Sequence, residues 1–303
     1  MAADKPITVL GSANADYVMR VAELPQPGET LMGQAFNIYR GGKGANQAVA
    51  CARLGAATRF IACVGDDAAG TDAIDALSAD GIDTTPVRRC SEQHTGSALI
   101  FVDDAGENCI GVAAGANDSL STADVDHHDA AIRSSAWLLM QLETPLDTIM
   151  QAARIADAAG IPVALNPAPA NAALPAELWP LLNLVTPNRG ELASLVGQNV
   201  DTDHELIAAA QSLSERGCKR VVITLGAGGA MIVDTHGATH VAGETVRATD
   251  TVGAGDTFNG ALIVALSENK TLVEAVRFAN KAAAIAVTRD GAQAAIPYRR
   301  EIG

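Results

Sequence analysis

Short apolar runs rich in β-branched residues alternate with longer segments of helical period along most of this chain, and this alternation limits the fold more than any other feature. The expected strands lie at residues 7–10, 59–64, 137–142, 163–166, 184–186 and 221–225. Continuous apolar runs of this length are typical of strands buried on both faces, and parallel neighbours need a crossover between them. The pattern therefore predicts an α/β fold in which helices cover a mostly parallel sheet.

The ends of several helices are marked by local signals. Thr144 followed by Pro145 predicts an N-cap with proline at the first helical position, and Gly160 predicts the end of that helix. Residues 202–205 and 271–274 each have the spacing of a capping box. These signals predict one helix after the strand at 137–142 and two more in the C-terminal third of the chain.

Two stretches, residues 17–39 and 95–113, interrupt the alternation because they carry strand-like runs with no helix between the runs. We expect both stretches to be hairpins inserted into the α/β body, where they would form a lid over a site. No repeat, low-complexity segment or Pro/Gly/Ser linker divides the chain. Residues 1–303 are therefore expected to form a single domain with these two insertions.

The charge balance excludes some classes of partner. The chain has 21 Lys and Arg against 35 Asp and Glu, a formal net charge of −14, which argues against nucleic acid or an anionic membrane surface. Aromatic residues make up only 3% and offer few platforms on which bases could stack. An anionic ligand must therefore be held by local groups.

Cysteine usage and hydropathy predict the compartment. The cysteines are odd in number, far apart and without a C-x-x-C pair, which favours a reducing environment over a disulfide framework. The first residues lack the apolar core of a signal peptide, and no apolar stretch reaches the roughly 20 residues of a membrane helix. We expect a cytoplasmic protein.

Residues 250–260 form the segment most indicative of chemistry, because two glycines and Asp256 directly precede the apolar run 261–266. Free N–H groups at the start of a helix bind anions, and a carboxylate beside them suits the orientation of an attacking hydroxyl in phosphoryl transfer. The alternative is purely structural, with a tight glycine turn and an acidic residue that favours a helix N-terminus. Both interpretations remain open from these residues alone.

Three other sites carry polar groups suited to a sugar or a phosphate. Lys43 lies among the glycines of 41–48, where it would reach a phosphate or remain solvated in a flexible turn. Asn14 and Asp16 share one side of an extended segment, which suits adjacent hydroxyls or an Asx-turn. Glu143 ends an apolar strand, where ligands of open α/β sheets bind and where helix-entry charges also occur.

Asn188 and Glu191 form an N-x-x-E pattern after the strand at 184–186, and such oxygens suit a hydrated Mg²⁺. Four residues alone make a weak signal. The histidines lie near none of these clusters in the sequence, and we assign them no catalytic role.

Taken together, these motifs resemble those of the ribokinase, or phosphofructokinase-B, family of carbohydrate kinases, and the similarity extends over nearly the whole chain. The two glycine-rich signatures are the most specific part, because they have the order and separation of that family. The segments that carry the resemblance are residues 11–16, 27–30, 41–48, 139–143, 166–169, 186–188, 223–226, 250–260 and 283–289.

The resemblance implies transfer of the γ-phosphoryl group of ATP to the 5-hydroxyl of D-ribose. It implies that Asp256 is the catalytic base and that the backbone amides of Gly253, Ala254 and Gly255 form an anion hole. The implied sugar-binding residues are Asn14, Asp16, Gly42, Lys43, Asn46, Glu143 and Asp256. The implied ATP-binding residues are Asn188, Thr224, Leu225, Gly226, Ala227, Gly228, Gly229, Gly255 and Asn280.

The same resemblance implies Mg²⁺, with Glu191 acting through water, and K⁺ as a monovalent activator beside the anion hole. The implied K⁺ positions, mostly through backbone oxygens, are Asp250, Val252, Ala286, Arg289, Gly291 and Ala295. Ala295 stands where the family frequently has serine, so a side-chain ligand is missing there. In fold, the resemblance implies a three-layer α/β/α sandwich with a β-sheet lid and a homodimer formed through that lid.

Related activities remain alternatives: a kinase for 2-deoxyribose, another pentose, fructose or a nucleoside, or a non-catalytic sensor of sugar or nucleotide. Asn14 and Asp16 favour vicinal hydroxyls, because a buried polar pair left unmatched by a deoxy sugar costs about 1–3 kcal/mol per group. The scarcity of aromatic residues disfavours a nucleoside. The complete anion-hole segment with Asp256 disfavours a sensor.

Overall fold

A nine-stranded sheet forms the centre of the protein, whose computed structural model describes residues 5–170 and 174–303. The strand order is β13-β12-β11-β10-β9-β8-β1-β4-β5. Neighbours from β11 to β5 are parallel, and only the β11–β12 and β12–β13 pairs are antiparallel. The prediction of a mostly parallel sheet is confirmed. The strands are β1 (Ile7–Leu10), β4 (Thr58–Gly65), β5 (Val87–Cys90), β8 (Trp137–Met140), β9 (Val163–Leu165), β10 (Leu184–Val185), β11 (Val221–Thr224), β12 (Ala230–Asp234) and β13 (Gly237–Val241).

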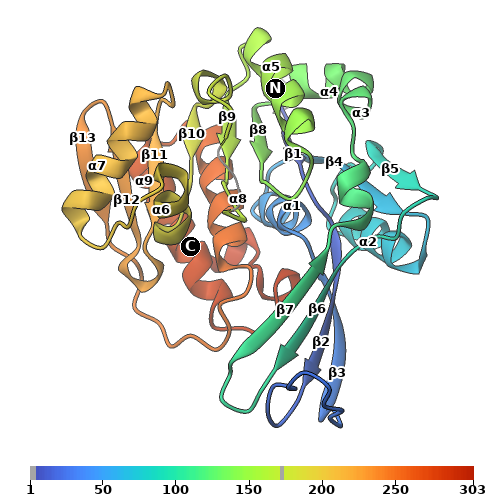
Figure 1. Cartoon of the computed structure of the whole chain (residues 1–303). Coiled ribbons are helices and arrows are strands. Elements are labelled where there is room, and N and C mark those ends of the chain that lie inside the picture. The colour runs from blue at the N-terminus through green and yellow to red at the C-terminus, as the bar shows by residue number, and fades with distance from the viewer. Residues whose placement is uncertain (1–4, 171–173) are drawn as a thin grey trace.

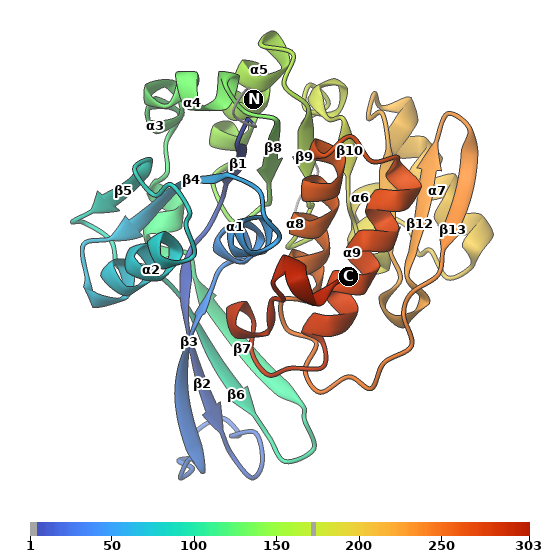
Figure 2. The same ribbon diagram turned by 180° about the vertical axis from the view of Figure 1, so that it is seen from behind.

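Helices cover both faces of this sheet (Figures 1 and 2). One face carries α1 (Lys43–Arg53), α2 (Ala68–Ala79), α8 (Ala254–Ser267) and α9 (Leu272–Ala286). The other carries α3 (Thr122–His127), α4 (Asp129–Arg133), α5 (Leu146–Ala158), α6 (Arg189–Val196) and α7 (Asp203–Glu215). None of the helices in the described part of the chain is both long and apolar enough to cross a membrane.

Strand β1 shows why the central strands have nearly continuous apolar sequences. All four of its residues are buried, with Ile7 and Val9 in the core under α1 and α8 and Leu10 in the core under α5. Because successive side chains of a strand point to opposite faces, a strand with a helical layer on each side is mostly apolar, and the one polar residue of β1, the buried Thr8, is hydrogen-bonded to Ser135. The three-layer arrangement is therefore confirmed together with the parallel sheet.

A second sheet projects from the body and forms the lid (Figure 1). Its strand order is β3-β2-β6-β7, and it consists of β2 (Asn14–Arg20), β3 (Ala35–Gly41), β6 (Gly96–Val102) and β7 (Asn108–Ala113). The hairpins β2–β3 and β6–β7 are joined through a parallel pairing of β2 with β6, in which Asn14 lies opposite Gly96. The smaller second sheet expected from the sequence is therefore present, and β2 begins before the expected insertion at residue 17.

Most of the expected helix ends agree with the structure, and one is wrong. Both capping boxes are formed, at Thr202 for α7 and at Thr271 for α9. Thr144 is not an N-cap, because Pro145 itself takes the N-cap position of α5 with φ −55° and ψ 137°. The Thr144 side chain is buried, and its hydroxyl has no hydrogen-bond partner among the described residues. The left-handed Gly160, with φ +69°, follows the end of α5 as expected.

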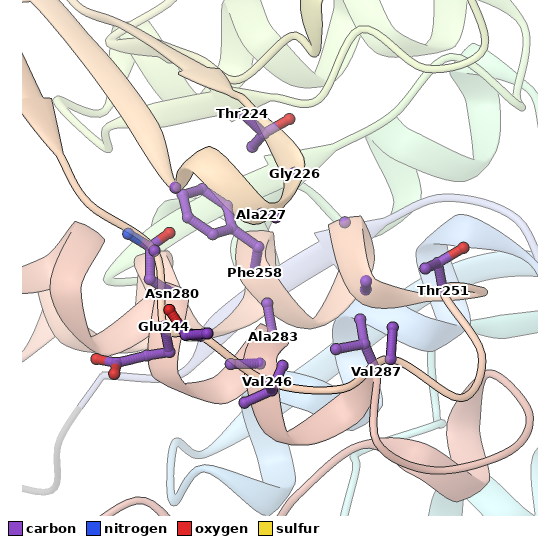
Figure 3. A pocket seen from close by; sticks show the side chains of 17 residues that line it. Thr224, Gly226, Ala227, Glu244, Val246, Thr251, Phe258, Asn280, Ala283 and Val287 are labelled. Carbon is purple, nitrogen blue, oxygen red and sulfur yellow. The ribbon is translucent and has the colours of Figure 1, made fainter.

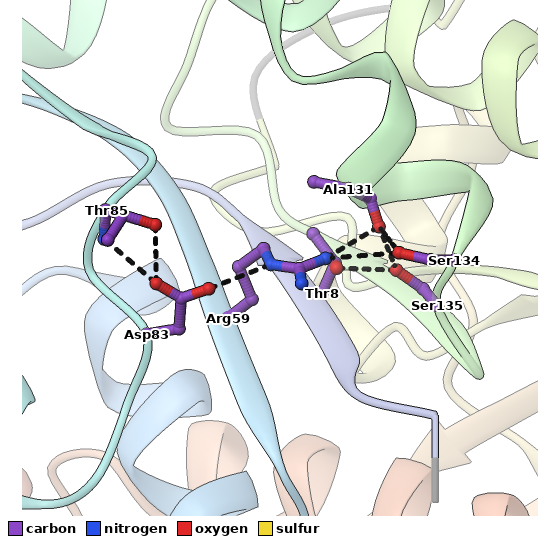
Figure 4. Close-up of polar contacts among 7 residues, drawn as sticks. All are labelled: Thr8, Arg59, Asp83, Thr85, Ala131, Ser134 and Ser135. Atoms are coloured by element: carbon purple, nitrogen blue, oxygen red, sulfur yellow. Dashed lines mark hydrogen bonds and ion pairs between the residues drawn. The ribbon is translucent and has the colours of Figure 1, made fainter. Parts of the chain in front are cut away.

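Arg59 joins several elements near the amino ends of the central strands (Figure 4). Its Nε donates to Oδ2 of Asp83 at 3.1 Å, and its Nη1 donates to the Ala131 carbonyl at 2.9 Å. In the same region the hydroxyls of Thr8 and Ser135 are hydrogen-bonded at 2.6 Å. These contacts tie β4 to the end of α4 on the edge of the sheet opposite the polar strand ends.

We expect Arg59→Met to lower the free energy of unfolding by about 1–3 kcal/mol, because it removes charge-assisted hydrogen bonds to Asp83 and to the partly buried Ala131 carbonyl. The control is Arg133→Met, which breaks an exposed ion pair with Asp129 and should cost about 0.3–0.5 kcal/mol. Urea denaturation measures both. Equal losses would show that the Arg59 contacts stabilise no more than an exposed pair.

Candidate active site

The carboxyl ends of the parallel strands meet at one edge of the sheet, and polar residues follow each of them. Gly11 to Asp16 follow β1, Gln141 to Glu143 follow β8, Asn166 follows β9, and Thr186 and Asn188 follow β10. The N-terminal halves of α1 and α8 reach the same edge, because the Lys43 N–H donates to Glu143 and the Asn259 side chain bonds to the Thr186 hydroxyl. In open α/β sheets this edge is where ligands bind.

Asp256 lies in the first turn of α8 and is 7% exposed. Its Oδ2 accepts a hydrogen bond from Nδ2 of Asn46 at 2.9 Å, and its Oδ1 accepts one from Nε2 of Gln47 at 2.9 Å. Both donors come from α1. Gly260 allows this close approach, because a Cβ there would lie 2.5 Å from the Cβ of Ala50 in α1.

The charge of Asp256 is set by opposing effects. Burial raises the pKa of this carboxyl above its usual range, while nearby Lys43 and the two amide donors act to lower it. Burial would by itself lower the pKa of Lys43, but the carboxylates of Asp256, Glu143 and Glu191 outweigh burial and raise it. Lys43 therefore stays protonated and supplies a fixed positive charge beside the carboxylates.

The first turn of α8 presents backbone N–H groups beside Asp256. Gly253 precedes the helix in the left-handed conformation with φ +72°, and a Cβ there would lie 3.1 Å from Cα of Ala292. The amides of a first helical turn lack intrahelical acceptors and form an anion site at the positive end of the dipole. The N–H of Ala254 makes a long turn bond of 3.3 Å to the Thr251 carbonyl. Of the three amides expected to form an anion hole, this one is already partly engaged.

Asn14 and Asp16 lie on the same face of β2, as the period of two predicts. Asn14 is buried, and its Oδ1 accepts a hydrogen bond from Nδ2 of Asn117 at 2.7 Å. Burial raises the pKa of Asp16 to about 6, and neighbouring Glu143 adds to the shift. Gly41 leaves space for the carboxylate, because a Cβ at that residue would lie 2.1 Å from Oδ2 of Asp16.

The N-terminus of α1 closes the same cluster. Gly42 has φ +87°, and a Cβ there would lie 2.7 Å from Cα of Ala13, so only glycine fits. Glu143 accepts hydrogen bonds from the Lys43 N–H at 3.0 Å and from the Ser12 hydroxyl. It therefore lies at the start of α1 rather than at the entry of the helix that follows it. Oδ1 of Asn46 is buried without a partner among the described residues, which leaves an acceptor for a ligand hydroxyl.

A cavity of about 370 Å³ lies beside the first turn of α8 (Figure 3). Of the expected ATP-binding residues, it is lined by Thr224, Gly226, Ala227, Gly229, Gly255 and Asn280. Leu225 and Asn188 line a smaller adjacent cavity, and Gly228 lines neither. Nδ2 of Asn280 donates to the carbonyls of Val241 and Ala242. The expected residues therefore gather at one place.

Several lining residues of this cavity were missed by the sequence analysis. They are mostly apolar or small, and they come from the irregular segment 243–248 and from the two C-terminal helices: Gly243, Glu244, Thr245, Val246, Ala248, Thr251, Ala254, Phe258, Ala283, Ala284 and Val287. An apolar wall of this kind suits the flat faces of a nucleobase. The segment 243–248 has neither helical nor strand period, so only its place next to α9 reveals its contribution.

Asn188 and Glu191 form the capping box of α6. Oδ1 of Asn188 accepts from the Glu191 N–H at 2.8 Å, and Oε2 of Glu191 accepts from the Asn188 N–H at 2.8 Å. The N-x-x-E pattern therefore has a structural role, which uses one carboxylate oxygen of Glu191. Burial raises the pKa of that carboxyl, and nearby Lys43 opposes the shift. The other oxygen fits an outer contact to hydrated Mg²⁺, an ion that keeps several of its waters. In the described ranges no three His, Cys, Asp or Glu side chains cluster as a metal site.

The loops expected to hold K⁺ are joined to each other. Oδ1 of Asp250 accepts from the Val252 N–H and Oδ2 accepts from the Gly291 N–H, each at 2.9 Å. The Arg289 guanidinium pairs with Glu301 at 2.6 Å, so it contributes no side-chain contact to this junction. The remaining two positions, Ala286 and Ala295, are buried. The Asp250 carboxylate therefore ties the two loops together, and each of its oxygens accepts from a backbone N–H group.

Five buried amides beside the site had no assigned role in the sequence analysis. They are Gln47, Asn117, Gln141, Asn166 and Asn259, with Gln47 bonded to Asp256 and to Asn166. Gln47 stands in the glycine-rich segment at 41–48, yet no local pattern distinguishes it from a solvent-exposed helical glutamine. Its partners Asn166 and Asp256 are 119 and 209 residues away in sequence.

We expect Gly253→Ala to lower the free energy of unfolding by about 1–2 kcal/mol, because an L side chain is strained at φ +72°. Gly255→Ala is the matched control two residues on, since nothing lies within 4 Å of its Cβ position and its backbone is helical. Thermal unfolding compares the two. A loss as large for Gly255→Ala would contradict the conformational explanation.

Comparison of the sequence with known proteins identifies the family of this chain. Residues 4–299 match the model of the pfkB family of carbohydrate kinases. The ribokinase of Haemophilus influenzae is 47% identical over 297 residues, covering 98% of this chain and 97% of that protein. A deoxyribokinase of Salmonella typhi is 36% identical over 291 residues, covering 96% of this chain and 95% of its own.

Solved structures agree with the sequence relatives. A ribokinase of Thermotoga maritima superposes with a TM-score of 0.91 at 38% identity, and one of Arabidopsis thaliana complexed with ribose and ATP superposes with 0.92 at 32% identity. Each comparison covers 98% of this chain and 97% of the other. The chain therefore belongs to the pfkB family of carbohydrate kinases, as its motifs and its lidded three-layer fold predict.

Proposed function

We propose that this protein is a ribokinase, which transfers the γ-phosphoryl group of ATP to the 5-hydroxyl of D-ribose and releases D-ribose 5-phosphate and ADP. One observation carries the proposal: a buried carboxylate, Asp256, lies between a polar cluster suited to a sugar and an apolar cavity suited to a nucleobase. The relatives named ribokinase, and the Arabidopsis thaliana structure with ribose and ATP, support it.

In this proposal the sugar lies between β2 of the lid and the start of α1. Asn14 and Asp16 bind adjacent hydroxyls, and the unpartnered Oδ1 of Asn46 accepts from another. Gly42, Lys43 and Glu143 complete the site, since Gly42 lets the backbone approach and Glu143 holds the start of α1. Each polar group lost to a mismatched sugar would leave a buried partner unsatisfied.

Asp256 accepts the proton of the 5-hydroxyl as the oxygen attacks the γ-phosphorus and the bond to ADP breaks. The amides of Gly253, Ala254 and Gly255, with Lys43, stabilise the negative charge of the transferring group. The nucleotide lies against Thr224 to Gly229, Asn188, Gly255 and Asn280. Much of the rate enhancement comes from holding the hydroxyl and the phosphate in line.

Two cations belong to the same proposal. Mg²⁺, held by the phosphates and through water by Glu191, would neutralise phosphate charge. K⁺ would lie where the loops of Asp250 and Gly291 meet, next to the left-handed Gly253. Its implied ligands are Asp250, Val252, Ala286, Arg289, Gly291 and Ala295, and we expect Arg289 to use its backbone because its side chain pairs with Glu301.

We also propose that residues 1–303 act as one cytoplasmic kinase domain, with lid segments at 17–39 and 95–113, and that two copies pair through the lid. The lid strands expose several large apolar side chains: Phe36, Ile38, Tyr39, Leu99, Ile110 and Val112. The register places Phe36, Ile38 and Leu99 on the face opposite Asp16, and Tyr39, Ile110 and Val112 on the same face as Asp16. Exposed apolar side chains grouped on one face of a sheet mark an interaction surface. The described cysteines are all free, as a reducing compartment requires.

A deoxyribose kinase is the second candidate, because a deoxyribokinase is among the relatives. The two activities differ in how the site treats the 2-hydroxyl. Asn14 is held by Asn117 and lies beside Asp16, so both polar groups are placed before the sugar arrives. We therefore favour ribose, whose hydroxyls satisfy both.

The assay mixes ribose, MgATP and KCl and follows the release of ADP, with deoxyribose and adenosine as competitors and NaCl in place of KCl. We expect the highest kcat/KM with ribose and a clear loss in NaCl. Asp256→Asn should lose several orders of magnitude in kcat with little change in ATP affinity, because it keeps the shape but not the base. Wild-type protein that binds ribose without releasing ADP would overturn the kinase proposal.

The pH dependence of the KM for ribose tests Asp16. With a pKa near 6, its carboxyl is ionised above that pH and accepts from sugar hydroxyls, and it becomes protonated below. We therefore expect the KM for ribose to rise as the pH falls through about 6. Asp16→Asn should have a higher KM at pH 8 and a flatter profile. A wild-type KM that is constant from pH 5 to 8 would contradict this role.

A further inference from the structure

Gln47 is fully buried, and both the nitrogen and the oxygen of its side-chain amide are hydrogen-bonded to other polar side chains. Its Nε2 donates to Oδ1 of Asp256 at 2.9 Å and to Oδ1 of Asn166 at 3.1 Å. Its Oε1 accepts from Nε2 of Gln141 at 2.6 Å. A primary amide has two N–H donors, and both are used here.

The orientation of this amide is determined by its neighbours. Nδ2 of Asn166 donates to the Thr186 carbonyl at 3.1 Å, so Oδ1 of Asn166 must face Gln47. An ionised Asp256 can only accept. If the Gln47 amide were reversed, its oxygen would face two acceptors at once. The arrangement therefore directs N–H groups at the Asp256 carboxylate.

The same contacts continue around the first turn of α8. The Thr186 hydroxyl bonds to Oδ1 of Asn259, and Nδ2 of Asn259 donates to the Gly255 carbonyl at 2.8 Å. We call Gln141, Gln47, Asn166, Thr186 and Asn259 the amide chain. It joins the ends of β8, β9 and β10 to α8 and touches that turn at the Asp256 side chain and at the Gly255 carbonyl.

We infer that Gln47 is a positioning residue for the catalytic base, which holds the Asp256 carboxylate in the orientation and ionised form that proton abstraction needs. The inference rests on the proposed function, since it gives Asp256 the role of base. A purely structural role is the alternative, because buried amides also fill space and satisfy one another. The two differ in whether replacing Gln47 changes the titration of Asp256.

The charged groups around Asp256 set the direction of that change. Lys43 of α1 favours its ionised form, while Glu143 after β8 disfavours it, as do Asp16 of β2 and Glu191 of α6 through their like charge. Burial favours the neutral form, and the amide donors oppose burial. Removing the Gln47 donor should therefore raise the pKa of the base and move the acid limb of its activity to higher pH.

The experiment measures kcat for wild type and Gln47→Met from pH 5 to 9 at saturating ribose and MgATP. Saturating ribose keeps the titration of Asp16, which acts on ribose binding, from affecting the measured kcat. Methionine keeps the approximate shape and removes the donors. We expect kcat at neutral pH to fall about 10- to 100-fold and the midpoint of the acid limb of the pH–kcat profile to shift about one pH unit higher. The KM for ATP should stay within about twofold of the wild-type value.

Two further variants separate positioning from folding. Arg59→Met, which loses partly buried contacts at the opposite edge of the sheet, should unfold more easily without shifting the acid limb of the pH profile. Gln47→Glu keeps the acceptor for Gln141 but replaces the donor with an oxygen, and it decides the question if Gln47→Met does not fold. We expect its acid limb to move further than that of Gln47→Met, because a second carboxyl group then faces Asp256.

An acid limb that stays at the wild-type pH in either Gln47 variant would overturn the positioning role, whatever the loss of kcat. So would a kcat within about twofold of wild type. If wild-type protein fails to phosphorylate ribose, the proposed function fails first, and that result is distinct from an active wild type whose Gln47 variants titrate normally.

Discussion

The contact between α1 and α8 is the constraint on which the rest of the site depends. Gly260 lets the two helices approach closely, and that approach brings Asn46 and Gln47 to the two oxygens of Asp256. A buried carboxylate is costly unless its oxygens are satisfied, and here two amides and nearby Lys43 provide that compensation. The proposed base, the proposed anion site and the start of the proposed sugar site are thus assembled by one helix pair.

The same region explains how an acidic protein could bind a negatively charged ligand. The protein carries a formal net charge of −14, yet the proposed substrate ATP is a polyanion. In the proposed function, helix amides and the half-buried Lys43 hold the anion locally, and because Lys43 is surrounded by carboxylates it remains protonated. The acidic surface therefore discourages nucleic acid without hindering a nucleotide that enters a confined site.

The sequence analysis succeeded where the position of a residue in its helix or strand follows from the local pattern. Asp256 beside its glycines, Lys43 among the glycines of α1, and Asn14 with Asp16 on one strand face are all found where the pattern placed them. The N-x-x-E pattern was ambiguous because Asn188 and Glu191 also satisfy the geometry of a helix cap, which is what they form. A local pattern cannot distinguish a cap from a metal contact when both need the same oxygens.

The sequence by itself determined the α/β class, the mostly parallel sheet, the smaller second sheet and the position of the acidic helix start, because each of these follows from periodicity or from glycine at a fixed offset. Only the tertiary structure decided that Gln47 faces Asp256, that Asn117 holds Asn14, and that the segment 243–248 lines the cavity beside α8. These roles depend on partners far away in the chain. The role of a buried amide depends on the groups that folding places beside it, and no local sequence pattern around the amide identifies those groups.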